Sequence, residues 1–193
     1  MDYKILLGAL AMMFSVAGFV PYTIGMVRGI NKPHAFTWLI WSVTTCGLFS
    51  AQIVSGGGSG AWPTGLVMCW CIGVCSYAFW RGDRRYDVWD WIFLIGASGA
   101  LVPWALTHDP WWSVLLLVII DVLGILPTVK KSYRRPYDEM VSLYLCGCAQ
   151  FTLSFLALTE VTFVTAAYPV TVFFVNLFFV AFVLARRRMV AAS

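Results

Sequence analysis

The stretch VTAAYPVTVFFVNLFFVAFVLA, residues 164–185, contains no charged side chain, and Arg186, Arg187 and Arg188 follow it directly. A helix needs about 20 mostly apolar residues to cross roughly 30 Å of hydrocarbon with its backbone groups bonded internally. The stretch therefore predicts a transmembrane helix. Outwards from it, the same kind of pattern occurs at residues 5–27, 36–54, 62–80, 88–106, 111–129 and 139–158.

Composition supports the same fold class over the whole chain. The 193 residues are 61% hydrophobic and only 11% charged, which is more apolar surface than a soluble domain of this size uses. The first stretch is interpreted as a retained helix and not as a signal peptide, because it is long and carries Pro21 near its end. We expect an all-α integral membrane protein of seven transmembrane helices, with any function inside the membrane or at its faces.

Basic residues are concentrated in alternate connections. Of the 13 lysine and arginine residues, all but Lys4 follow the first, third, fifth or seventh stretch. By the positive-inside rule these regions are cytoplasmic, which puts the N-terminus outside and the C-terminus inside. Short loops with this bias favour a prokaryotic inner membrane. Topology accounts for the charges without a nucleic-acid partner.

An internal repeat organises the chain. Gly18-Phe19-Val20-Pro21 recurs 106 residues later as Gly124-Ile125-Leu126-Pro127, and Trp62-Pro63 recurs at the same separation as Tyr168-Pro169. The repeat predicts a three-helix bundle in residues 1–86, a linker helix in 87–108 and a second three-helix bundle in 109–193. Because the linker adds one crossing, the two bundles are parallel, with a cavity near the pseudo-two-fold axis between them.

The residues around the repeated prolines resemble a known motif. Pro21-Tyr22, followed by Pro33 and Thr37-Trp38, and Pro127-Thr128, followed by Pro136 and Ser142, look like two PQ-loop repeats in which Tyr22 and Thr128 stand in place of glutamine. The three-plus-one-plus-three layout is similar to that of the SWEET sugar transporters. The resemblance implies facilitative transport of a sugar or similar polar metabolite by alternating access.

Polar residues near the middle of the apolar stretches are the candidate binding groups, because polar atoms are costly in hydrocarbon. An amide can donate to and accept from a polyol, and an indole offers an apolar face to a sugar ring. The amide of Asn176 could instead bond between helices, Trp70 could be a lipid-facing side chain, and Trp41 could have an interface or packing role. The predicted substrate-binding residues, paired by the repeat except for Trp41, are Ser15, Thr45, Gln150, Trp70, Asn176 and Trp41.

Asp121 is the one acidic residue well inside a predicted helix, where a lone carboxylate is protonated or paired. Three roles are open: proton coupling, direct contact with the solute, or a hydrogen-bonded structural acid. Pro21 and Pro127 occupy equivalent positions, where each removes a backbone hydrogen bond. The pair is interpreted as hinges between the two halves, with static kinks as the alternative.

Other function classes are less well supported by the sequence. The first alternative is a proton-coupled carrier of an amino acid or related metabolite that uses Asp121, and the second is a non-transporting accessory or receptor-like subunit. The sequence shows neither a nucleophile with a base nor a pair of carboxylates, which are features that would indicate an enzyme. The six cysteines lie within predicted helices and His34 and His108 lie on opposite sides, so no metal or cofactor is expected. The expected partners are a small solute and the lipid bilayer, and a homo-oligomer is left open.

Overall fold

The computed structural model describes residues 3–30, 33, 35–81, 88–125, 129, 132–134, 136–137 and 140–191, and within them it contains helices and turns but no strand. The expected all-helical class is confirmed for this part of the chain. The elements are α1 (Tyr3–Val27), α2 (Ala35–Val54), η1 (Gly58–Ala61), α3 (Trp62–Arg81), α4 (Val88–Gly99), α5 (Val102–Thr107), α6 (Trp111–Gly124), α8 (Val141–Leu156) and α9 (Phe163–Ala191).

Several helices have the length and composition of membrane spans. Among the described elements these are α1, α2, α3 taken together with η1, and α9, while α6 and α8 are apolar but shorter. Large apolar side chains on their outer surfaces are exposed, for example Ile72 on α3 and Phe178 on α9. Such surfaces are expected where the surrounding solvent is lipid.

The predicted linker helix, residues 88–106, is interrupted, and the prediction of one continuous helix was wrong. α4 ends at Gly99 and α5 begins at Val102, with Pro103 in its first turn. Proline has no N–H and its ring clashes with the preceding turn, which explains the break. The backbone N–H of Trp104 donates instead to Oγ of Ser113 on α6, over 3.1 Å. The break therefore attaches the linker to α6.

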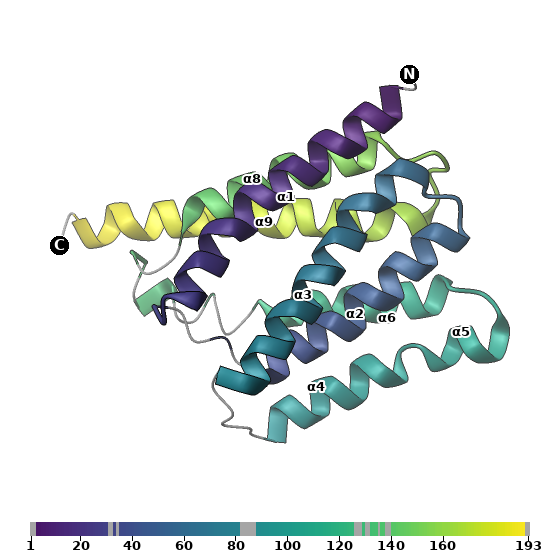
Figure 1. Ribbon diagram of the computed structural model, residues 1–193, viewed down its shortest axis with the longest axis horizontal. Coiled ribbons are helices and arrows are strands. Elements are labelled where there is room, and N and C mark those ends of the chain that lie inside the picture. Colours follow the sequence, from purple (N-terminus) through teal and green to yellow (C-terminus); the bar gives the residue numbers. More distant parts are fainter. Residues whose placement is uncertain are drawn as a thin grey trace.

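The helices pack in two series of three. α3 packs against both α1 and α2, and α9 packs against both α6 and α8. Between the series, α1 packs along α8 and α2 packs along α6, while α4 lies against α2 and α6. Figure 1 shows α1 running along α8, with α4 and α5 at the opposite edge of the molecule. Each helix contact in the first series thus has a counterpart in the second.

Two glycines at equivalent positions allow the crossings between the series. A Cβ atom at Gly18 of α1 would lie 3.5 Å from Cβ of Cys146 on α8, and one at Gly124 of α6 would lie 3.0 Å from Nε1 of Trp41 on α2. An alanine at either position would require a side chain of the opposite helix, Leu143 or Trp41, to shift by a few tenths of an ångström. These glycines are the first members of the repeated motif.

Candidate functional site: a central cavity

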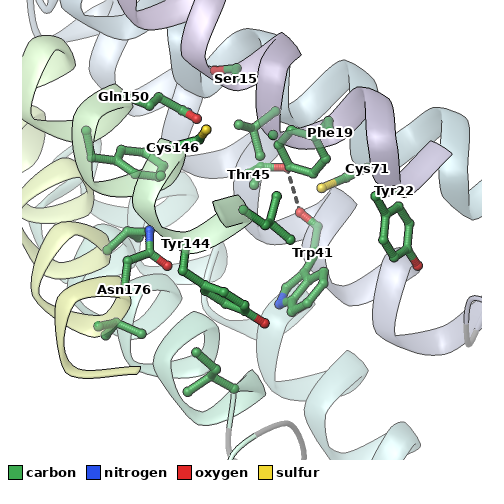
Figure 2. A pocket seen from close by; sticks show the side chains of 18 of the residues that line it. Ser15, Phe19, Tyr22, Trp41, Thr45, Cys71, Tyr144, Cys146, Gln150 and Asn176 are labelled. Atoms are coloured by element: carbon green, nitrogen blue, oxygen red, sulfur yellow. Dashed lines mark hydrogen bonds between the residues drawn. The ribbon is translucent and has the colours of Figure 1, made fainter. Parts of the chain in front are cut away.

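A cavity of about 570 Å³ lies between α1, α2, α3, α6, α8 and α9. Ligand sites for small molecules have volumes of roughly 300–1,000 Å³, with mostly apolar walls and a few polar groups. This cavity fits that description, as the side chains in Figure 2 show. Its polar lining residues are Ser15, Tyr22, Thr37, Thr45, Cys71, Asp121, Tyr144, Cys146, Gln150, Tyr168 and Asn176.

The structure brings most of the predicted binding residues together. Ser15, Trp41, Thr45, Gln150 and Asn176 all line the cavity, although they come from α1, α2, α8 and α9. The hydroxyl of Ser15 donates to the carbonyl of Ala11 over 3.3 Å, and that of Thr45 donates to the carbonyl of Trp41 over 2.6 Å (Figure 2). Because both hydroxyl hydrogens are used within their own helices, these oxygens face a solute as acceptors.

Trp70 is the predicted binding residue that the structure places elsewhere. It does not belong to the cavity wall; its Nε1 donates to Oγ1 of Thr23 over 2.9 Å, and its ring stacks on Phe19 at a centroid distance of 5.4 Å. From α3, Val67 and Cys71 face the cavity instead. Trp70 therefore joins α3 to α1, and its predicted role in binding the solute has no support in the cavity wall.

Two amide side chains in the wall are available to a solute. Gln150 is only 3% exposed, yet its Nε2 has no hydrogen-bond partner. None of the described residues hydrogen-bonds the amide of Asn176, and Gly147 on α8 leaves room for that amide, because a Cβ there would meet its Nδ2. Buried amides are nearly always bonded. These two therefore favour a ligand role over a bond between helices.

Asp121 faces the cavity from α6, close to the wall formed by α3 and α9. Within the described part of the chain, no group donates a hydrogen bond to its carboxylate and no basic side chain pairs with it. Cys71 and Tyr168 lie within electrostatic reach of it. These contacts do not support the third role of Asp121, that of a hydrogen-bonded acid that stabilises the structure. Solute contact and proton coupling stay as predictions.

The cavity opens at the end where α1 finishes and α2 and α8 begin. Its lining there includes Ile30, which is 74% exposed, Met140, which is 52% exposed, and Pro33. The sequence places Arg28 and Lys32 at the same end, on the side predicted to be cytoplasmic. We call this end the basic end.

At the opposite end the cavity stops at two buried rings, Phe151 and Tyr168, which are 5% and 4% exposed. Beyond them the segment 56–61 contacts the segment 156–160. The backbone N–H groups of Glu160 and Thr159 donate to the carbonyls of Gly56 and Gly57, over 3.1 and 3.2 Å. We call this region the closed end.

Side chains reinforce the closed end from both series of helices. Oγ of Ser59 donates to the carbonyl of Ala157 over 3.2 Å, and Nε2 of Gln52 donates to the carbonyl of Thr165 over 3.0 Å. Lys4, the one basic residue predicted outside, donates to the carbonyl of Leu158 over 2.8 Å. A cation is favourable beside the last carbonyls of a helix, here α8, which gives Lys4 a structural role.

The repeat relates the two sides of the cavity wall. Each lining residue of α1 named below has a lining counterpart 106 residues later, in or directly after α6. Each one of α2 has a counterpart 105 residues later on α8, and each one of α3 has a counterpart 105 residues later on α9. The pairs are Ser15 and Asp121, Phe19 and Ile125, Trp38 and Leu143, Trp41 and Cys146, Thr45 and Gln150, Val67 and Val172, and Cys71 and Asn176.

Sequence reasoning missed the aromatic walls. Tyr144, Phe151 and Tyr168 line the cavity, together with Phe19 and Tyr22. Helical spacing could have found some of them, since Tyr168, Val172 and Asn176 follow one another at intervals of four residues along one stripe of α9.

The expected hinge prolines are placed only in part. Pro21 lies within α1 and is exposed, so it is not in the cavity wall, and the helix continues past it to Val27. Pro127 lies outside the described residues. All six cysteines are free, as expected for residues that do not form a disulfide framework.

The fold and the site together define a helical protein with several membrane-length apolar helices around a solute-sized cavity. Comparisons with protein-family models, with curated proteins and with solved structures found no match to this chain. The functional conclusion therefore depends on the geometry of the cavity and on the sequence.

Proposed function

We propose that this chain is an integral membrane carrier that moves a small solute by alternating access through the central cavity. The observation that carries the proposal is the asymmetry of the cavity, which opens at the basic end and is shut at the closed end. The groups that shut it come from residues 52–60 and 154–165, one set from each half of the repeat. Alternating access requires a binding site that is open to only one side of the membrane at a time.

The proposed architecture is seven crossings in two parallel three-helix bundles, with the N-terminus outside and the C-terminus in the cytoplasm. The matching contacts of α3 and α9 support it, as do the paired positions in the cavity wall. The interrupted linker, α4 with α5, packs outside the cavity against α2 and α6. In this orientation the cavity faces the cytoplasm.

A sugar or similar polar metabolite is the solute class that the resemblance to SWEET transporters implies. The wall contains the groups that such a solute needs, namely amides at Gln150 and Asn176 and aromatic faces at Trp38 and Trp41. The second candidate is proton-coupled transport of an amino acid or related metabolite, in which Asp121 of the cavity wall would carry the proton. A non-transporting accessory or receptor-like subunit is the third.

Uptake into proteoliposomes, across a panel of sugars, amino acids and nucleosides with and without a pH gradient, separates these candidates. A carrier takes up at least one solute faster than protein-free liposomes do. If correctly inserted protein takes up no solute of the panel, the accessory role is favoured. Uptake at the same rate with and without the pH gradient, retained in the Asp121→Asn variant, would exclude proton coupling.

A disulfide across the closed end tests the mechanism itself. A Cβ at Gly56 would lie 3.5 Å from Cβ of Glu160, within the range of about 3.5–4.5 Å found in disulfides, and both residues are exposed. The double variant Gly56→Cys, Glu160→Cys should lose uptake when oxidised and recover it with dithiothreitol. The two single variants are the controls, and Gly56→Cys alone also measures the cost of placing a side chain at φ 77°. Full uptake by the oxidised protein would contradict opening at this end.

A further inference from the structure

We infer that the cavity selects a small organic cation that carries an acceptor oxygen and no carboxylate. The inference concerns the solute class of the carrier proposed above and depends on that function for transport, but not for binding. It rests on the charge of Asp121, on the arrangement of the rings around it and on the amides of the wall.

The carboxylate of Asp121 supplies the charge. An isolated carboxylate in an apolar wall is costly unless a positive partner or a proton neutralises it. The described residues provide no such partner, and no lysine, arginine or histidine occurs among those that line the cavity. A bound cation would neutralise Asp121 directly, which a neutral sugar would not do.

Aromatic rings lie on both sides of Asp121 along the cavity. Towards the basic end, the Trp41 indole lies against Gly124, one helical turn from Asp121, and meets Trp38 edge to face at a centroid distance of 5.2 Å. Towards the closed end, Phe151 and Tyr168 meet edge to face at 5.4 Å. Tryptophan faces attract cations best among side chains, and the attraction strengthens when water is excluded.

The amides complete the specificity. Nε2 of Gln150 is a buried donor without a partner, so the solute should offer it a hydroxyl or carbonyl oxygen. A carboxylate on the solute would meet the like charge of Asp121, and the described wall has no base to compensate for that repulsion. This argues against an amino-acid zwitterion.

Three probes of similar size test the inference on the full chain, reconstituted in lipid nanodiscs. Choline has the cation and a hydroxyl, 3,3-dimethylbutan-1-ol has the same shape without charge, and glycine betaine has the cation with a carboxylate. We expect calorimetry to show choline binding at least tenfold tighter than either of the others. Equal affinity for choline and its neutral isostere in the wild-type protein would overturn the inference without any variant.

A matched pair of variants assigns the charge. Asp121→Asn should weaken choline binding at least tenfold and leave the neutral alcohol unchanged. Asp109→Asn, in the turn before α6, is the control: its side chain caps Trp111 over 2.9 Å outside the cavity, and asparagine keeps that cap. Unchanged choline affinity in a folded Asp121→Asn protein contradicts the inference.

Transport separates this inference from the proposed function. Proteoliposomes that take up a neutral sugar, but neither bind nor move choline, would refute the cation site and leave the carrier in place. Protein that binds choline with the expected selectivity, but moves no solute at all, would retain the cation site and refute the carrier.

Discussion

Oγ of Ser154 on α8 donates a hydrogen bond of 2.7 Å to the carbonyl of Gly60 in η1, although the two residues lie 94 positions apart in the chain. Ser154 is fully buried and Gly60 is buried beside it. The bond joins the two halves of the repeat at the closed end. A buried carbonyl that loses such a donor keeps the full cost of its desolvation.

Ser154→Ala should therefore weaken the closed end. We expect the free energy of unfolding to fall by about 1–3 kcal/mol, since the Gly60 carbonyl would be left without its side-chain partner. Thermal unfolding in detergent measures the change. Ser76→Ala is the control, because the Ser76 hydroxyl is exposed and donates only to Ile72 of its own helix, over 2.9 Å. Equal effects of the two substitutions would show that the bond across the halves adds nothing.

Gly60→Ala should disturb the same region by steric conflict. A Cβ at this position would lie 2.6 Å from the backbone N of Leu158 and 2.7 Å from the carbonyl O of Ser154, so the backbone must move. We expect faster cysteine labelling of the closed end, measured with an Ala157→Cys reporter, because Ala157 is fully buried there. Gly73→Ala is the matched control, since nothing lies within 4 Å of a Cβ there, and in a helix it should stabilise by roughly 0.5–1 kcal/mol. A Gly60→Ala protein that labels at the wild-type rate contradicts the close packing.

The position of Trp70 shows where sequence reasoning stops. The helical class follows from hydropathy, and five of the six predicted binding residues lie in the cavity wall, because hydropathy and the repeat depend on composition and approximate spacing. The pairing of Trp70 with Asn176 used a separation of 106 residues, whereas the positions of α3 and α9 that share the cavity lie 105 apart. One residue on a helix is a rotation of about 100°, enough to turn a side chain from the cavity to a neighbouring helix.

Pro103 itself signals a break in the linker, but the partners that stabilise this break and the closed end were beyond prediction for another reason. The break before Pro103 is stabilised by Ser113, and the close packing of Gly60 depends on Ser154 and Leu158. These partners are distant in sequence and are specified only by the packing of whole helices. Hydropathy and single-residue propensity contain no information on them.

Trp70 and Trp41 should respond differently to substitution. Trp70→Phe removes the hydrogen bond to Thr23 but no cavity group, so we expect a stability loss of about 0.5–1.5 kcal/mol and unchanged solute affinity. Trp41→Leu removes an aromatic face of the cavity and should reduce affinity about tenfold, the effect of roughly 1.4 kcal/mol. Thermal unfolding and calorimetry on both proteins give the two quantities. Weaker binding in Trp70→Phe with normal binding in Trp41→Leu would reverse the assignment.

Gly147 offers a test of Asn176 that leaves the amide in the protein. Because a Cβ at Gly147 would meet Nδ2 of Asn176, Gly147→Ala must displace that amide within the cavity. We expect the loss of solute affinity to match that of Asn176→Ala, about tenfold, since one hydrogen bond is worth about 0.5–1.5 kcal/mol. Alanine favours the helix at position 147, so α8 itself should not be weakened. Wild-type affinity in Gly147→Ala, with Asn176→Ala impaired, would show that the amide can bind the solute from a second rotamer.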